Sequence, residues 1–338
     1  MYDIIIFGSA AQDINVKSRA LKILKDNTDF LTGEGICLPL GSKIDVEDII
    51  FTSGGSGTNT AVAFAKQGFK TAFCGAIGAD IAGLEIVREL KRLRVDTKFL
   101  VKKKDKRTTH SIVISSAGKD RTILIYIGAS GSFNKDNILW NKIKKTKWFY
   151  LAPLKDSFCD AFEEIVNFAV ANKIRLAVNP SKQQLALPEE KIKNLLQKVD
   201  VLFLNLEEAS FLTKIPMTEE QNIFKKIAEI CTGIVVITKG ASGVTAFDGK
   251  NFYSAMPEPN RKIVDATGAG DSFAAGFLSD YILQSGNIEM AIQLGIANSE
   301  ANLSEVGAKT GLLDKNAKFN RVSVSKEMCT ENNLCLPK

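Results

Sequence analysis

The chain is poor in the residues that bind transition metals and build disulfide frameworks. It has a single histidine, His110, and its six cysteines include no C-x-x-C pair. Zinc sites made of histidine and cysteine are therefore unsupported by the spacing, and a histidine-dependent catalytic triad would have to use His110. Several cysteines lie in apolar segments, which is typical of reduced thiols, and we predict a cytoplasmic location.

Long apolar runs and nucleic-acid-binding motifs are also missing. No stretch reaches the roughly 18 apolar residues of a membrane span, and no basic segment precedes the short apolar stretch at the start. The net charge is +6, but basic runs such as 91–94, 102–106 and 142–147 are typical of solvated surface. No recognition-helix, zinc-finger or aromatic RNA-binding signature accompanies them. We therefore expect neither a membrane nor a nucleic acid as a partner.

What the chain does have is a regular alternation of apolar strands and helical segments. Of its 338 residues 45% are hydrophobic, enough for the core of one large domain. Helical patterns occupy the intervening segments, for example 59–68 and 82–93. This rhythm predicts an α/β fold, a doubly wound and mostly parallel sheet with helices on both faces. The expected strands are 3–7, 70–78, 148–152, 175–180, 201–205 and 234–240.

Two segments do not fit this core. Residues 14–50 are too long for a plain link and contain a probable strand at 44–51, and residues 108–127 alternate like a hairpin around "SAGKD". Together they predict a small β-sheet lid on a single domain that spans residues 1–315. Residues 316–338 are polar and weakly patterned, so we expect a C-terminal strap or tail.

The lid hairpin is apolar on both faces. Its alternation predicts one face with Ile112, Ile114, Ile123 and Ile125 and another with Val113 and Leu124. Only one face can cover a substrate, so the outer face would stay exposed in a monomer. We therefore predict a homodimer formed through the lids.

The stretch "IVDATGAGDSFAAGF", residues 263–277, places small residues directly before an apolar helix. Gly268, Ala269 and Gly270 let backbone N–H groups approach an anion, and the helix dipole adds partial positive charge. Asp271 falls at the helix N-terminus, where the dipole favours its ionised form. It is a candidate general base for an alcohol that attacks a phosphate. Taken alone, the motif has a simpler explanation, a tight turn with an N-cap aspartate.

A second motif of small residues, "SGGSGTN", occupies residues 53–59. Gly54 and Gly55 leave the backbone open to a ligand, and Asn59 offers a donor and an acceptor at a helix start. Asp13 is expected to end the first strand, and strand carboxyl ends share one edge of a doubly wound sheet with helix starts. We predict that Asp13 and Asn59 converge there on vicinal hydroxyls. Ordinary turn chemistry is the alternative.

Two further motifs follow strands in the second half of the chain. "NLEEA" contains Asn205 and Glu208, and "TKGASGV" contains Thr238, Gly240 and Gly243. Both lie at carboxyl strand ends. A glycine-rich turn there can accept a nucleotide phosphate, and Glu208 can hold a metal-bound water.

In this order and spacing, "GGSGTN", "NLEE", "TKGASG" and "DATGAGD" resemble the motifs of the PfkB, or ribokinase-like, family of carbohydrate and nucleoside kinases. The resemblance covers roughly residues 3–313. It implies ATP-dependent phosphorylation of a hydroxymethyl group on a small sugar or nucleoside. It also implies a doubly wound α/β domain with a β-sheet lid, and ATP, Mg²⁺ and K⁺ as cofactors.

The resemblance implies a role for each motif residue. Asp271 would be the catalytic base, and the amides of Gly268, Ala269 and Gly270 the anion hole. The acceptor would be held by Asp13, Gly54, Gly55 and Asn59. The phosphates and magnesium would be served by Asn205 and Glu208, the latter through water, and the nucleotide would be lined by Thr238, Gly240, Gly243 and Asn298. A monovalent cation would be bound by Asp265, Thr267 and carbonyls near Gly307.

The chain departs from the family pattern at three points, one of which is the unusually long segment before "SGG". Ala266 replaces a small hydroxyl residue or proline, and "YLAPL" at 150–154 lacks the glutamate that ribokinase uses on its sugar. The acceptor therefore stays open between a free sugar, a sugar acid, a nucleoside and a phosphosugar. Lysines near the lid, such as Lys43, favour an anionic acceptor unless they face solvent.

Two other functions compete with the kinase. A nicotinamide oxidoreductase needs G-x-G-x-x-G after the first strand, and "FGSAAQ" does not supply it. The other alternative is a catalytically silent binding or regulatory protein. Such a protein has no need of a catalytic base, so the presence of Asp271 together with Gly268 and Gly270 argues against it. Both alternatives are weaker than phosphoryl transfer.

Overall fold

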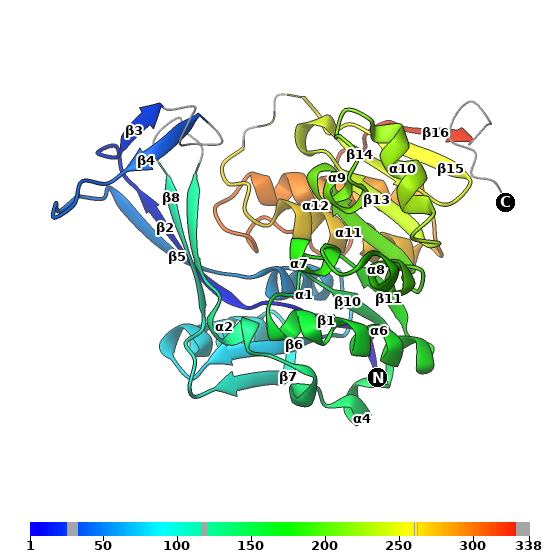
Figure 1. Ribbon diagram of the computed structural model, residues 1–338, viewed down its shortest axis with the longest axis horizontal. Coiled ribbons are helices and arrows are strands. Elements are labelled where there is room, and N and C mark those ends of the chain that lie inside the picture. Colours follow the sequence, from blue (N-terminus) through cyan, green and yellow to red (C-terminus); the bar gives the residue numbers. More distant parts are fainter. Residues whose placement is uncertain (26–32, 116–120, 260, 262, 329–338) are drawn as a thin grey trace.

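The structure, a computed structural model, describes residues 1–25, 33–115, 121–259, 261 and 263–328. Its centre is a ten-stranded sheet in the order β16-β15-β14-β13-β12-β11-β10-β1-β6-β7 (Figure 1). The strands from β13 to β7 in this order are parallel, and β14, β15 and β16 extend the sheet antiparallel. The strands are β1 (Tyr2–Phe7), β6 (Thr71–Gly78), β7 (Asp96–Lys103), β10 (Thr146–Leu151), β11 (Arg175–Val178), β12 (Val201–Asn205), β13 (Ile234–Thr238), β14 (Val244–Phe247), β15 (Asn251–Ala255) and β16 (Val324–Met328).

The central strands are apolar on both sides because helices cover both faces of the sheet. In β1, Ile5 and Phe7 pack into one core and Ile4 and Ile6 into the other. This is the pattern of parallel strands that are buried on two faces, so β1 reads as an unbroken apolar run. The predicted fold class is confirmed, and each of the expected strands is present.

Helices from the two ends of the chain cover one face of the sheet, and helices from its middle cover the other. One face is covered by helices near the two glycine motifs, α1 (Ser56–Lys66), α2 (Ile81–Arg92), α11 (Ala269–Leu283) and α12 (Ile288–Leu303). The other face is covered by helices from the middle of the chain, α6 (Phe162–Ala171), α8 (Glu189–Leu196), α9 (Leu206–Thr213) and α10 (Glu220–Ala228). Shorter helices are α3 (Gly128–Gly131), α4 (Trp140–Ile143), α5 (Ser157–Asp160), α7 (Lys182–Leu185), and the 3₁₀ turns η1 (Lys135–Asn137) and η2 (Gly240–Ser242).

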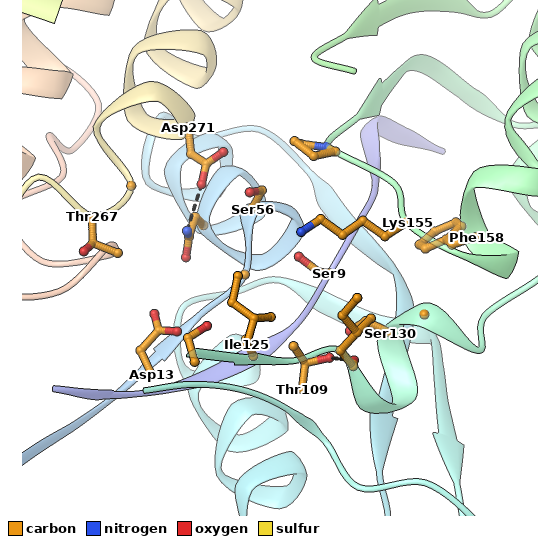
Figure 2. A pocket seen from close by; sticks show the side chains of 18 residues that line it. Ser9, Asp13, Ser56, Thr109, Ile125, Ser130, Lys155, Phe158, Thr267 and Asp271 are labelled. Carbon is orange, nitrogen blue, oxygen red and sulfur yellow. Dashed lines mark hydrogen bonds between the residues drawn. The ribbon is translucent and has the colours of Figure 1, made fainter. Parts of the chain in front are cut away.

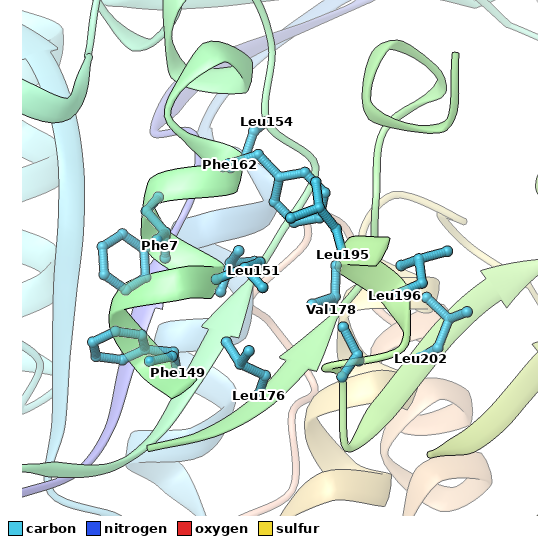
Figure 3. Close-up of a cluster of buried hydrophobic side chains, with 14 of the residues drawn as sticks. Phe7, Phe149, Leu151, Leu154, Phe162, Leu176, Val178, Leu195, Leu196 and Leu202 are labelled. Carbon is cyan, nitrogen blue, oxygen red and sulfur yellow. The ribbon is translucent and has the colours of Figure 1, made fainter. Parts of the chain in front are cut away.

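Figure 3 shows the core on the second face. Phe162 of α6 and Leu195 and Leu196 of α8 point onto the strands, where they meet side chains such as Leu151 and Val178. All five side chains are buried. Burial of such residues contributes roughly 1.5–3 kcal/mol each relative to exposure. This packing fixes the carboxyl end of β10, and the loop that follows it contributes Pro153 and Lys155 to the candidate site.

A second, four-stranded sheet in the order β5-β2-β8-β9 stands off the core (Figure 1). Its strands are β2 (Ala11–Lys17), β5 (Asp48–Gly54), β8 (Thr109–Ser115) and β9 (Thr122–Tyr126), and we call this sheet the lid. The predicted hairpin at 108–127 is present as β8 and β9, and part of its turn, residues 116–120, lies outside the described residues. The predicted strand at 44–51 begins at Asp48 and runs to Gly54. A separate hairpin, β3 (Lys22–Lys25) and β4 (Glu34–Cys37), was not anticipated.

The lid register corrects the predicted faces of the hairpin. Ile112 lies opposite Leu124, and Val113 lies opposite Ile123. Residues directly opposite each other share a face, so Leu124 belongs with Ile112. Val113 is buried and lies on the face that also carries Ile125. The predicted grouping was therefore wrong by one residue in β9.

The end of the described chain joins the sheet. Within the segment expected to be a strap or tail, residues 324–328 form β16 beside β15, while residues 329–338, with Cys329 and Cys335, lie outside the described part. The four cysteines of the described part are free thiols, namely Cys37, Cys74, Cys159 and Cys231. In the same part, no helix combines the length and apolar character needed to cross a membrane.

Candidate active site

Two pockets lie on either side of one short turn. The first is a cavity of about 300 Å³ between the lid and the core, and Gly268 and Asp271 are among its lining residues (Figure 2). The second measures about 490 Å³, and Ala269 and Gly270 are among its lining residues. Four consecutive residues, 268–271, therefore separate the two pockets and contribute to the walls of both.

The turn begins α11 in a conformation that depends on glycine. Gly268 is the N-cap, with φ of 84°, and a Cβ there would lie 2.6 Å from the Cβ of Ala308. Gly270 has no atom within 4 Å of the position its Cβ would take, so this position faces open pocket space. The first amides of a helix have no carbonyl partner within it. The N–H groups at the start of α11 are thus available to an anion, and the dipole of α11 favours one.

Asp271 is buried and held by the start of α1. Asn59 Nδ2 donates a hydrogen bond of 2.8 Å to its Oδ2. Burial raises the pKa of Asp271 to about 6, while hydrogen bonds from Asn59 and Ser56 oppose the rise. From the sequence we predicted that the helix dipole favours the ionised form of this carboxylate. Desolvation is the larger effect, yet a pKa of about 6 still leaves Asp271 ionised at neutral pH.

Asp13 reaches the first pocket from the lid. We predicted it at the end of the first strand, but β1 stops at Phe7 and Asp13 lies within the lid strand β2. It is 6% exposed, and burial raises its pKa against the hydrogen bond from Ser111. A Cβ on Gly54 would lie 1.9 Å from Asp13 Oδ2, so a bare backbone at Gly54 is what admits the carboxylate. Gly55, with φ of 93°, is the N-cap of α1.

A buried lysine that sequence reasoning missed lies behind this pocket. Lys309 Nζ donates to Ser53 Oγ at 2.6 Å and pairs with Glu89 Oε2 at 3.2 Å. Burial lowers the pKa of Lys309, and the negative charges of Glu89, Asp13 and Asp271 oppose this. In turn, the charge of Lys309 opposes the rise that burial causes in the pKa of Asp13 and of Asp271. Lys309 therefore favours the ionised form of both pocket carboxylates without lining the pocket.

Asn205 and Glu208 form a capping box at the start of α9. The Asn205 side chain accepts from the Glu208 backbone N–H at 2.7 Å, and Glu208 Oε2 accepts from the Asn205 backbone N–H at 2.9 Å. Burial raises the pKa of Glu208 against the Asn205 hydrogen bond, and the charge of Asp271 adds to the rise. Neither Asn205 nor Glu208 is among the lining residues of the two pockets. Their role toward the phosphates and magnesium therefore stays a prediction, and a carboxylate such as Glu208 is a usual partner for a water-bound divalent cation.

The second pocket is lined mainly by glycines and apolar side chains. Thr238, Gly240 and Gly243, which we predicted to line the nucleotide, are among its lining residues. The other walls are mainly apolar and include Arg261, which pairs with Glu258 and Glu300. Gly243 has φ of 86°, and a Cβ there would lie 2.1 Å from the carbonyl oxygen of Ala255. The apolar wall consists of Val244, Met256, Pro257, Pro259, Ile263, Phe273, Ile296 and Leu303.

Asn298 does not line this pocket. Its side chain is buried, where Nδ2 donates to the Ser272 carbonyl at 2.7 Å and Oδ1 accepts from the Leu313 N–H at 2.9 Å. Its neighbour Ser299 lines the pocket instead. Asn298 therefore connects α12 to α11 and to the loop after α12. Our prediction that it lines the nucleotide pocket was wrong.

Asp265, Thr267 and Gly307 lie together, but their surroundings do not fit an open site for a monovalent cation. Asp265 Oδ1 accepts from the Thr267 N–H at 2.9 Å and hydroxyl at 2.7 Å, and Oδ2 accepts from the Gly307 N–H at 3.0 Å. The Arg121 guanidinium lies 3.3 Å from Oδ1. The Gly307 carbonyl accepts from Asn302 at 3.1 Å. A lid arginine thus supplies positive charge where we predicted potassium, and we derive no step through that ion.

Arg121 also shifts the acidity of its partner. Although burial alone raises the pKa of Asp265, the hydrogen bonds from Thr267 and Gly307 and the Arg121 charge lower it overall. The Asp265–Arg121 pair joins the loop before the 268–271 turn to the lid.

Comparisons with known proteins show which family the chain belongs to. The family model of pfkB family carbohydrate kinases matches residues 28–316. The chain is 28% identical over 288 residues to the ribokinase of Staphylococcus aureus (strain COL), across 84% of this chain and 92% of that one. It is 25% identical over 292 residues to adenosine kinase 2 of Arabidopsis thaliana, across 79% of this chain and 82% of that one.

A solved structure has the same fold. Arabidopsis thaliana ribokinase complexed with ribose and ATP superposes with a TM-score of 0.76 at 21% identity, across 93% of this chain and 96% of that one. The family predicted from the motifs is thereby confirmed. The chain belongs to the pfkB family of carbohydrate kinases.

Proposed function

We propose that this kinase transfers the γ-phosphoryl group of ATP to a hydroxymethyl group of a sugar or nucleoside. The observation that carries the proposal is the turn at 268–271, which lines both pockets. A phosphate bound at its amides faces Asp271 on one side and the apolar pocket on the other. The donor and the acceptor therefore meet at one point of the chain.

The chemistry follows from the position of Asp271. Its carboxylate takes the proton of the acceptor hydroxyl as that oxygen attacks the γ-phosphorus of ATP. One oxygen–phosphorus bond forms, and the bond from the γ-phosphorus to the bridging oxygen breaks. The products are the phosphorylated acceptor, ADP and a proton held at Asp271. The amides of Gly268, Ala269 and Gly270 stabilise the charge on the transferring group.

The nucleotide belongs in the second pocket. Its apolar wall suits a purine base, and Thr238, Gly240 and Gly243 lie at the strand ends nearest the phosphates. Glu208, with Asn205 as its capping partner, is our candidate to hold magnesium through water. When bound, magnesium neutralises charge on the phosphates during transfer.

The acceptor belongs in the first pocket. Asp13 and Asn59 offer hydrogen bonds to hydroxyls, and Gly54 and Gly55 let the acceptor lie against the backbone. The ribokinase of Arabidopsis thaliana was solved with ribose and ATP, which supports a sugar and a nucleotide as the two substrates.

A coupled assay of ADP release across sugars and nucleosides tests the function. We expect ADP release that depends on an acceptor, and a fall in kcat of about 10²-fold or more in Asp271→Asn with unchanged nucleotide affinity. Asp314→Asn, a change of the same chemistry at an exposed site, serves as control. Wild-type turnover by folded Asp271→Asn enzyme would remove this residue from the mechanism.

We also propose a homodimer through the lids. Ile14, Phe51, Ile112 and Leu124 lie in register across the four strands, on the face opposite Asp13. Phe51 is 59% and Leu124 53% exposed. An apolar face of this kind on a monomer is a candidate for association, and symmetric pairing of two lids would cover it.

A further inference from the structure

The first pocket contains one positive charge that the proposed reaction does not use. Among the described residues that line it, Lys155 is the only cation, and the other charged groups are Asp13 and Asp271. Figure 2 shows the Lys155 side chain extending into the cavity toward Ser56 and Ser9, from the side opposite Asp13. The pocket thus has a carboxylate at one end and an ammonium group at the other.

Lys155 is carried by a loop that is fixed on both sides. The loop follows β10, whose carboxyl end reaches the site next to β1. The backbone N–H groups of Leu154 and Asp156 donate to the side chains of Gln184 and Gln183, both at 2.9 Å. Gln184 is fully buried. A loop held at both neighbouring residues presents Lys155 in a defined place.

No protein group neutralises this lysine. In the described part of the chain, no carboxylate lies within 4.0 Å of Lys155 Nζ, although Asp156 is its neighbour in sequence. Other lysines of the same region are paired, such as Lys182 with Glu207 at 2.6 Å. An unpaired ammonium group in a pocket rimmed by hydroxyls is a ready partner for an anion, since charge-assisted hydrogen bonds are stronger than neutral ones.

We propose that Lys155 selects an acceptor that carries a carboxylate, that is, a polyhydroxy acid in preference to a neutral sugar. This inference rests on the proposed function and names its substrate class. The hydroxyls of the acid lie toward Asp13, its hydroxymethyl group faces Asp271, and its carboxylate binds Lys155. The described lining of the pocket has one positive charge, on Lys155, and two carboxylates, Asp13 and Asp271. A ligand with one negative charge therefore fits better than a phosphate dianion, which the two carboxylates would repel more strongly.

Matched acceptors provide the test. The kcat/KM values for D-gluconate and D-ribonate are compared with those for D-glucitol and D-ribose by ADP release, with fructose 6-phosphate as the phosphate arm. We expect the acids to exceed their neutral counterparts by at least about tenfold, the low end for a charge-assisted hydrogen bond. Equal values for acids and neutral sugars, or a preference for the phosphosugar, would overturn the proposal.

Variants at position 155 assign the preference to the side chain. Lys155→Gln should lower kcat/KM for the acids about 10- to 100-fold and leave the neutral sugars within about threefold. Lys155→Arg should retain the preference, and Lys155→Glu should reverse it. Lys193→Gln, an exposed lysine on α8, should change nothing. If Lys155→Gln instead raises KM for ATP with every acceptor, Lys155 contacts the γ-phosphate and the proposal is wrong.

A binding measurement separates this inference from the proposed function. Calorimetric titration of the wild-type chain with D-gluconate and with D-glucitol needs no turnover. Tighter binding of the acid, lost in Lys155→Gln, supports the inference even if phosphoryl transfer is absent. Turnover of neutral sugars with no binding of either acid supports the kinase and refutes the role of Lys155.

Discussion

Asn59 Nδ2 lies 2.8 Å from Asp271 Oδ2, although 212 residues separate them in the sequence. The bond joins the start of α1 to the start of α11 and so joins the two glycine motifs. It fixes the carboxylate that we propose as the base and opposes the rise in its pKa caused by burial. Several measurable properties depend on this pair.

Activity should fall in acid as Asp271 takes up a proton. Its pKa of about 6 means that a protonated carboxyl replaces the base below that pH. We expect kcat/KM for the acceptor to be level above pH 7 and to fall about tenfold per unit below pH 6. The residual rate of Asp271→Asn should lack this dependence. A wild-type profile that is flat from pH 5 to 8 would contradict the assignment.

Stability should change with pH in the opposite sense. The pKa of Asp271 rises on folding from 3.8 to about 6, so its ionisation destabilises the native state as pH increases through this window. Asp271→Asn should exceed the wild type in free energy of unfolding by up to about 3 kcal/mol above pH 6 and by little near pH 4, as urea titrations would measure.

Asp265→Asn is the matched control for that experiment. The pKa of Asp265 is lowered on folding, so its charged form stabilises the native state above its ordinary pKa. This variant should be less stable than the wild type at pH 8. The same sign for both variants would show that desolvation does not dominate at Asp271.

Gly270→Val should impair ATP use more than folding. The position faces open pocket space, its φ is not in the left-handed region, and an added Cβ has no atom within 4 Å. The new side chain would therefore occupy the path of the γ-phosphate in the proposed reaction. We expect at least a tenfold loss in kcat/KM for ATP, on the order of one lost electrostatic contact, with a melting temperature near that of the wild type. Unchanged kinetics would place the phosphate elsewhere.

Gly268→Ala should behave differently from Gly270→Val. At Gly268 φ is 84° and the added Cβ would lie 2.6 Å from that of Ala308. A left-handed conformation and a clash both oppose a side chain here. Thermal denaturation should therefore show a clear loss of stability for this variant.

Asp13 and Gly54 should act as a pair on the acceptor. Asp13→Ala should raise KM for the acceptor by about 10- to 100-fold and leave KM for ATP unchanged, as expected for lost charge-assisted hydrogen bonds. Gly54→Ala should give a similar defect, because its methyl group would lie 1.9 Å from Asp13 Oδ2. In the Asp13→Ala background Gly54→Ala should have little further effect. Additive defects would show that Gly54 acts independently.

The lid face predicts the oligomeric state. Light scattering should give twice the mass of one 36.8 kDa chain at micromolar concentration. Leu124→Lys, on the apolar outer face, should yield monomers, whereas Ile123→Lys, on the opposite face of the same strand, should remain dimeric. A wild-type chain that scatters as a single copy would refute the dimer.

The parts of the fold that repeat locally could be predicted from the sequence. The buried strands show as apolar runs, and the turn at 268–271 shows as glycines before a helix. Asp13 and Asn59, which we predicted to converge, both line the first pocket, although Asp13 reaches it from the lid strand β2 and not from the end of β1.

The errors lie where the outcome depends on contacts between distant segments. Lys309 meets Glu89 and Ser53 from other parts of the chain, and no local pattern marks it. The face of Leu124 depends on the register set by the hairpin turn, and a shift of one residue reverses it. Asn298 was misplaced because neighbouring positions on a helix face different directions, and Ser299 is the one that reaches the pocket.

The edge strand of the lid and the helix that holds the base are one continuous stretch of chain. β5 ends at Gly54, α1 begins at Ser56, and only Gly55 lies between them. A displacement of the lid therefore reaches, through a single residue, the helix whose Asn59 orients Asp271. We expect water to be a poor substitute for the acceptor, because it cannot hold the lid in place. Futile hydrolysis of ATP, seen as ADP release without acceptor, should accordingly be slow.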